Sequence, residues 1–501
     1  MMSVLMLGTI SCDDLLDVQP RNSVSADGVL SSPDAVQAAV NSTYARLREL
    51  TLYGRNMQGL SEALADNAFV TRNSGRLINE NLNTQGTSAT PNHFTHWQQS
   101  YFGINEININ LAAISAENVG SISPAPTQAQ LDKWQSELKF LRALYYHNLV
   151  KAYAYDPGAT VPSQDKGGVP LMLEPITTSG SATAALSARA SVADVYTQIY
   201  QDLNDAIAIA PTTGGPFFAT RTAAQALLSR VALFNKDYAT VVSNATAALT
   251  ASGPIIAGTA YVNGFRASTN PESIFELKFQ DANEAVGGVN ESNQSTYTSA
   301  LSLSALTSQG GWGDLAPNAP FRTQLGITGP VPSSTTVGQF CTGTDIRVQL
   351  YAIGPGRGSG PKVECVKFAA KNGIAYLDNV PVIRRSEVLL NRAEAYATPG
   401  SPVFDEALAL ADLNTLRVAR GLTAVALTGT ALYNEILNQR RIELAFEGHR
   451  WFDLKRLGRD VLKAGTVAGA TDIPFTDPRI LPAIPQRELD ANPNLVQNTG
   501  Y

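Results

Sequence analysis

Residues 439–456, near the C-terminal end of the 501-residue chain, read QRRIELAFEGHRWFDLKR and decide the fold. They belong to a longer stretch, 430–456, in which a helical apolar pattern predicts one helix. On that helix Arg440, Glu443 and Glu447 share a face, at positions i, i+3 and i+7. Arginine and glutamate side chains at this spacing form ion pairs, so the pattern predicts a charged network with a structural role.

The same stretch also allows a catalytic interpretation. Glu447, His449 and Asp453 could form an acid/base cluster for hydrolysis. No nucleophile motif accompanies them, and Arg441 or Arg450 could instead pair with the glutamates of the helix. The structural interpretation is therefore favoured.

Helical patterns extend over most of the chain. They cover residues 33–50, 95–114, 127–153, 191–209, 222–234, 238–250, 383–397 and 405–420. Three helices share the pattern [FL]-x-R-[AV]-x-x-[YF], at 140–146, 228–234 and 390–396, and the latter two are each followed by a second helix. Helix pairs built on small and aromatic positions are typical of tetratricopeptide-like scaffolds. The predicted fold class is all-α, a helix-pair scaffold with large insertions.

Two regions interrupt the helical pattern. Residues 56–91 are rich in Asn, Thr, Ser and Gly, and residues 253–381 hold most of the strand-like and turn-rich sequence, including alternating residues at 275–279. Long loops in a compact protein are usually functional, although ligand-free surface loops remain an alternative.

Composition limits the function classes. The chain has 37 Lys and Arg against 43 Asp and Glu, a net charge of −6, and no basic tract, so we expect no nucleic-acid partner. Its four histidines and three cysteines match no four-ligand zinc pattern. We therefore expect no metal site and no cofactor.

The N-terminus resembles an export signal. Residues 4–10 are almost wholly apolar, too short to span a bilayer, and are followed by Ser11, Cys12 and two aspartates. This resembles a bacterial lipobox in which Cys12 is acylated, although no Lys or Arg precedes it. The alternative is a buried apolar N-terminal segment.

Two further cysteines, Cys341 and Cys365, lie in the loop-rich region. In an exported protein a disulfide between them is chemically permitted. Two separate buried thiols are the equal alternative.

Several motifs together resemble the SusD/RagB family of nutrient-capture lipoproteins. They are the lipobox, Trp97-x3-Tyr101-x2-Ile104-x3-Asn108, the helices at 140–146 and 384–396, Val169-Pro170-Leu171, Leu481-Pro482-Ala483-Ile484-Pro485 and, most specifically, the 439–456 run. The resemblance runs from Cys12 to Tyr501.

This resemblance implies a non-enzymatic, cell-surface binding protein that captures oligosaccharide. It implies a lipid anchor at the outer membrane, facing outward, and a SusC-like TonB-dependent transporter as partner. The expected organisation is a signal peptide (1–11), a lipidated leader (12–30) and one domain (31–501). That domain divides into an N-terminal helical part (31–250), a loop-rich ligand-face insertion (251–381) and a C-terminal helical part (382–501).

Candidate ligand residues are aromatic rings and polar side chains in these loops, because sugars are held by ring faces and by amide, carboxylate and guanidinium groups. One cluster is Asp66, Asn67, Arg72, Asn73 and Arg76, near His93, His96 and Trp97. The other is Tyr297, Trp312 and Asp314, the last two within Gly310-Gly311-Trp312-Gly313-Asp314. Core packing is the stronger reading for Trp97, Trp134 and Trp451, whereas Trp312 is the better candidate for contact.

Three rival functions remain open from sequence. A peptide-binding member of the same family would differ only in loop chemistry. A surface glycoside hydrolase would need two carboxylates about 5–9.5 Å apart, and no motif points to such a pair. A scaffold that only assembles proteins is disfavoured by the lipobox and the long polar loops.

Overall fold

The computed structural model describes residues 30–279, 284, 288–371, 373–466 and 468–501. The predicted signal peptide, Cys12 and all but the last residue of the predicted leader lie outside the described residues. In the described part, no helix is both long and apolar enough to cross a membrane.

Helices form most of the regular secondary structure. They are α2 (Pro33–Arg46), α3 (Asn56–Leu64), α4 (Ile78–Asn81), α5 (Trp97–Ala113), α6 (Gln128–Tyr153), α7 (Ser179–Ala184), α8 (Val192–Ile209), α9 (Arg221–Phe234), α10 (Tyr238–Ser252), α11 (Gly258–Arg266), α12 (Asn293–Tyr297), α13 (Ala319–Leu325), α14 (Arg385–Ala397), α15 (Glu406–Ala419), α16 (Gly429–Glu443), α17 (Arg450–Arg456) and α18 (Gln486–Ala491). Six of the long helices, α2, α6, α8, α9, α10 and α15, begin at a residue whose side chain caps the helix. Thr127 and Gln130 form a capping box at α6, and the Ser191 hydroxyl accepts from the Asp194 amide at α8.

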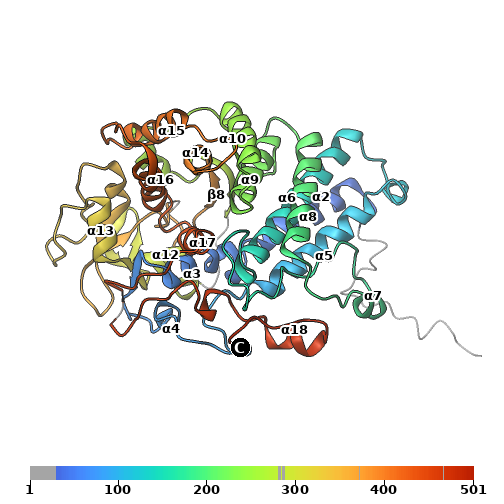
Figure 1. The fold of residues 1–501 in the computed structure, drawn as a ribbon, viewed down its shortest axis with the longest axis horizontal. Helices are drawn as coiled ribbons and strands as arrows, with labels where there is room; N and C mark the ends of the chain where they lie inside the picture. Colours follow the sequence, from blue (N-terminus) through green and yellow to red (C-terminus); the bar gives the residue numbers. More distant parts are fainter. Residues whose placement is uncertain (1–29, 280–283, 285–287, 372, 467) are drawn as a thin grey trace, which may run out of the picture.

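The long helices stack side by side along the molecule. The row runs from α5, α6 and α8 through α9 and α10 to α14, α15 and α16, each helix contacting its neighbours (Figure 1). This arrangement confirms the predicted all-α, tetratricopeptide-like scaffold.

The repeated arginine of the three-helix pattern has one role in all three copies. Each copy donates two hydrogen bonds to a carboxylate on a later helix of the row. The pairs are Arg142 with Asp202, Arg230 with Glu387, and Arg392 with Asp412, at 2.6–2.8 Å. Bidentate arginine–carboxylate pairs fix direction as well as distance, so these arginines set how α6, α9 and α14 meet α8, α14 and α15.

The predicted helix over 430–456 is wrong in one respect, because it is two helices. The chain leaves α16 after Glu443 and enters α17 at Arg450, and between them Phe446 and Gly448 have φ values of 64° and 89°. A Cβ on Gly448 would lie 2.8 Å from the Met57 carbonyl oxygen. This close approach to α3 requires glycine, and the turn takes Glu447 off the helix face predicted for it.

The charged network of this region exists, but with other partners than predicted. Glu443 accepts from Arg347, Arg384 and Arg420, and Glu447 accepts from Lys367 and Arg384, all of them buried. Although burial alone would raise it, the three guanidinium groups hold the pKa of Glu443 well below its ordinary value. Arg441 and Arg450 instead pair with Asp66.

The strands form four two-stranded antiparallel sheets in the described residues, and one of them, β2–β8, lies against α9 and α14. The strands are β1 (Ala68–Val70), β2 (Ser273–Leu277), β3 (Ala300–Ser302), β4 (Ala305–Gln309), β5 (Leu315–Pro317), β6 (Tyr351–Gly354), β7 (Lys362–Cys365) and β8 (Val380–Arg384). They pair as β1–β5, β2–β8, β3–β4 and β6–β7. The 56–91 region is therefore not one long loop, because it contains the buried helix α3 and strand β1.

Cys341 and Cys365 are free, buried thiols, which settles the open alternative. Both flank Tyr351: the Cys341 amide donates to the Tyr351 carbonyl on one side, and Cys365 is the register partner of Tyr351 on the other. The two cysteines are thus two strand spacings apart, about 9–10 Å. A disulfide requires Cα atoms within about 7 Å, so the pairing is excluded.

Candidate functional site

Trp312 lies on a glycine-rich loop that is pressed against the chain between Ser295 and Leu301. A Cβ on Gly311 would lie 2.1 Å from the Thr298 carbonyl oxygen, and one on Gly310 would lie 2.4 Å from the Leu301 Cα. The Trp312 amide donates to the Ser295 carbonyl at 3.2 Å. The glycines therefore let the loop pack closely, and the indole remains partly exposed at the surface.

The segment after β1 holds this loop from a second direction. The Thr71 hydroxyl donates to the Gly313 carbonyl at 2.8 Å, and the Asn73 side-chain amide donates to the Trp312 carbonyl at 2.8 Å. Arg76 donates to the Asp314 carboxylate, which also accepts from Ser74. The predicted clusters at 66–76 and 312–314 thus meet in part, because Asn73 and Arg76 contact the Trp312 loop.

A third segment, which the sequence patterns did not indicate, also contacts Trp312. The β6–β7 hairpin ends in GPGRGSGP, residues 354–361, and places the Arg357 guanidinium over the indole ring, 4.1 Å from Cζ to the ring centroid. The Ser359 hydroxyl donates to the Asn73 side-chain oxygen. Arg357 stands between glycines, as Trp312 does in GGWGD, so the sequence criterion that selected Trp312 also applies to Arg357.

We call this region the Trp312 surface and define it as Trp312, Arg72, Asn73, Asn290, Arg357, Ser359 and Lys362. The indole Nε1 donates to the Asn290 side-chain oxygen at 3.2 Å. A polar hollow of about 440 Å³ adjoins it, lined by residues 75–80 together with Arg55 and Glu291. Ring, amide, hydroxyl and guanidinium groups from segments far apart in sequence are thus combined at one surface.

Asp66 and Asn67, predicted as ligand contacts, are buried and bond to other side chains of the interior. Arg450 donates two hydrogen bonds to Asp66, at 2.6 and 2.8 Å, and Asn67 bonds Glu62 and Arg441. Burial opposes ionisation of Asp66, but the charge of Arg450, with Arg441, holds its pKa below the ordinary value. These side chains connect the α3–β1 region to the α16–α17 turn.

Tyr297, Asp314 and Trp97 are also buried. Tyr297 packs edge-on against Phe446 within the core, and Asp314 orients Arg76 and Ser74 instead of facing a ligand. Trp97 is 2% exposed and packs against Tyr101 and Tyr153, as its helical spacing suggested. It also forms part of the wall of an apolar hollow of about 260 Å³ between α5, α7 and α18, which none of the other candidate ligand residues lines.

Of the predicted ligand residues, Arg72 is exposed, and Asn73, Arg76 and Trp312 are partly exposed. His93 and His96 are buried among aromatic rings, and burial lowers the pKa of each to about 3. They are therefore neutral core residues.

The acid/base interpretation of Glu447, His449 and Asp453 has no geometric support. Both carboxylates are engaged by buried cations, Glu447 by Lys367 and Arg384 and Asp453 by Arg440 and Arg456. The cavity beside Glu447 and His449 measures about 20 Å³, room for one water molecule. The described residues also contain no group of three His, Cys, Asp or Glu side chains that could hold a metal ion.

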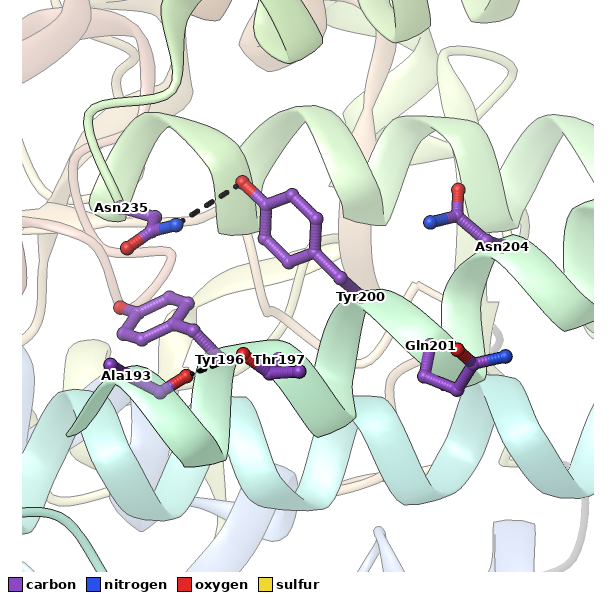
Figure 2. A pocket seen from close by; sticks show the side chains of 7 residues that line it. All are labelled: Ala193, Tyr196, Thr197, Tyr200, Gln201, Asn204 and Asn235. Atoms are coloured by element: carbon purple, nitrogen blue, oxygen red, sulfur yellow. Dashed lines mark hydrogen bonds between the residues drawn. The ribbon is translucent and has the colours of Figure 1, made fainter. Parts of the chain in front are cut away.

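A separate hollow of about 440 Å³ lies along α8, in the opposite half of the molecule from α12 and α13 (Figures 1 and 2). Figure 2 shows Tyr200 pointing toward Asn235, whose amide donates to the phenol at 3.5 Å. Thr197 and Gln201 also bond within the chain, to Ala193 and Asp205. Because most of its polar groups are already used internally, this hollow is a weaker candidate than the Trp312 surface.

A stacked helical scaffold that carries an aromatic and polar surface on its loops is typical of a class of binding proteins. Comparison with known proteins identifies the family to which the chain belongs. A model described as the SusD family matches residues 363–501, and one described as "Starch-binding associating with outer membrane" matches residues 14–233. The chain belongs to the SusD/RagB family.

Individual relatives agree with this assignment. SusD-like protein P38 of Formosa agariphila is 24% identical over 99% of this chain and 97% of its own. A SusD superfamily structure from Bacteroides thetaiotaomicron is 25% identical with a TM-score of 0.77, covering 93% of this chain and 99% of that one. A laminarin-binding SusD-like protein, 21% identical, superposes with a TM-score of 0.69 over 94% of this chain and 100% of that one.

Proposed function

We propose that this protein binds oligosaccharide at the Trp312 surface and does not cleave it. The observation that carries the proposal is a partly exposed indole surrounded by amide, hydroxyl and guanidinium groups on loops held by a rigid scaffold. An aromatic face receives the apolar C–H face of a sugar, and the polar groups bond its hydroxyls. The family description and the laminarin-binding neighbour support the same ligand class.

The cellular role that we propose follows the family. Acylation at Cys12 anchors the chain to the outer membrane, facing the exterior, and the bound oligosaccharide passes to a SusC-like TonB-dependent transporter. The description of the N-terminal match as a protein associating with the outer membrane supports this location. Replacing Cys12 by alanine should release the protein from membranes of cells that lack the transporter, as measured by fractionation, and continued retention would contradict the anchor.

The binding proposal is tested on a glycan array followed by calorimetric titration of the best ligand. Wild-type protein should bind with a dissociation constant in the micromolar to millimolar range, about −4 to −8 kcal/mol, and chromatography should show no product. Trp312→Ala should remove most binding. Phe404→Ala is the matched control, because Phe404 is an exposed aromatic side chain, 48% exposed, in the turn between α14 and α15.

Two outcomes would contradict the proposal. Equal glycan affinity in Trp312→Ala and Phe404→Ala would place the site elsewhere on the molecule. Multiple-turnover cleavage by the pure protein would favour a hydrolase.

A further inference from the structure

Among the described residues, none of the three cations at the Trp312 surface forms an ion pair with a carboxylate, although the buried Glu364 interacts electrostatically with Lys362. Arg72 is exposed and makes neither an ion pair nor a side-chain hydrogen bond there. The Arg357 guanidinium lies over the Trp312 ring and donates to the carbonyl oxygens of Gly310 and Gly311, both at 3.4 Å. The Lys362 ammonium donates to Ser359 and to the Gly360 carbonyl.

The carboxylates of the same region are already neutralised or buried. Asp314 pairs with Arg76, and Glu291 pairs with Arg55. Glu364, beside Lys362, is buried under hydrogen bonds from Thr298 and Ser299, and burial raises its pKa. Glu80 and Arg55 both line the adjoining hollow, and the two side chains attract each other electrostatically. The surface therefore has surplus positive charge on a chain whose net charge is −6.

The backbone holds Arg72 at this surface. Its φ of 65° is in the left-handed region, which is unfavourable for a residue with a side chain. Its two neighbours, Thr71 and Asn73, both donate to carbonyl oxygens of the Trp312 loop. Strain maintained by flanking hydrogen bonds is a recognised feature of binding sites, and here it holds the exposed Arg72 between two residues that contact the Trp312 loop.

We infer that the ligand of the Trp312 surface is an acidic oligosaccharide, which carries carboxylate or sulfate groups. A guanidinium without a carboxylate partner can donate two parallel hydrogen bonds to such a group, and Arg357 is already oriented by the Trp312 ring. Arg72 and Lys362 can take further anionic groups along the same chain. This inference rests on the proposed glycan-binding function and narrows its substrate class.

The test uses an array of plant and algal oligosaccharides in which each acidic member is matched by its neutral form. Galacturonate oligomers are paired with their methyl esters, and sulfated galactan oligomers with their desulfated forms. Wild-type protein should bind acidic members at least about tenfold more tightly than their matched neutral forms, a difference of about 1.4 kcal/mol. Raising NaCl from 50 to 500 mM should weaken that binding, because exposed charges are screened. The two matched series distinguish carboxylate from sulfate recognition.

Substitutions test which residues produce the selectivity for acidic over neutral oligosaccharides. Arg72→Gln and Arg357→Gln should each lower the ratio of acidic to neutral affinity by about five- to tenfold, since hydrogen bonds to charged groups are stronger than neutral ones. Arg459→Gln is the matched control, because Arg459 is exposed and its side chain makes no hydrogen bond or ion pair among the described residues. Its selectivity ratio should equal that of wild type.

The outcomes separate this inference from the proposed function. Equal binding of acidic and neutral forms, lost in Trp312→Ala, would overturn the acidic class and leave glycan binding intact. Selectivity that survives in the double variant Arg72→Gln/Arg357→Gln would also overturn it. Binding to no member of the array would contradict the glycan-binding function itself.

Discussion

Arg230 of α9 and Glu387 of α14, 157 residues apart in sequence, are joined by two hydrogen bonds of 2.6 Å in the interior of the protein. Both side chains are almost fully buried, whereas the equivalent pair Arg392 and Asp412 is 21% and 11% exposed. The same sequence pattern therefore places one ion pair in the core and one at a partly exposed position of the same scaffold.

This difference predicts unequal effects of one substitution. Arg230→Met should lower the free energy of unfolding by about 3–5 kcal/mol, because it leaves the buried Glu387 carboxylate unpaired. Arg392→Met should cost less, about 1–3 kcal/mol, since this pair is partly exposed to solvent. Urea denaturation measures both values. The double variant Arg230→Met/Glu387→Leu should recover part of the loss, and no recovery would contradict the unpaired-charge explanation.

A second prediction concerns pH. Burial raises the pKa of Glu62 to about 7, despite hydrogen bonds from the Phe446 amide at 2.8 Å and the Asn67 amide at 3.0 Å. The folded state then binds this proton more tightly than the unfolded state does. The resulting stability is present below the unfolded pKa of about 4.5 and is lost as the pH rises through about 7.

The measurement compares unfolding free energies at pH 5 and pH 8. Glu62→Gln should remove up to about 3 kcal/mol of the pH-dependent loss seen in wild type, because the amide does not ionise. Glu117→Gln, at an exposed position, is the control and should change nothing. Identical pH profiles of unfolding free energy for wild type and Glu62→Gln would show that Glu62 has the same pKa in the folded and unfolded states.

The scaffold could be predicted from sequence, whereas the partners of its polar side chains could not. Helical periodicity located α5, α6, α8, α9, α10, α14 and α15 to within a few residues, because each buries one regular stripe. Asp66 looked like a surface loop residue because its partner Arg450 is 384 residues away. Loop composition records polarity but not burial, so the sequence indicates Trp312 as a contact residue but does not show that Tyr297 is buried.

A third prediction follows from the strand register around Tyr351. Cys341 and Cys365 should both titrate as free thiols when Cys12→Ala protein is unfolded in guanidinium without reductant. In the folded protein both should react slowly, because burial raises the pKa of each thiol to about 12. Fewer than two thiols per chain in the unfolded, unreduced sample would reinstate the disulfide.

The last prediction tests how the Trp312 loop is held. Gly311→Ala would place a methyl group 2.1 Å from the Thr298 carbonyl oxygen, and backbone on both sides limits relaxation. The loop must then move away from the chain at 295–301, which should cost about 1–3 kcal/mol of stability and displace the indole from Asn290 and Arg357. Glycan affinity should fall as far as in Trp312→Ala, although the ring is still present. Gly120→Ala is the control, since a Cβ at Gly120 meets no atom within 4 Å. Thermal denaturation alongside calorimetric titration separates the two quantities, and a Gly311→Ala protein that is destabilised yet binds with wild-type affinity would show that the position of the loop does not control the site.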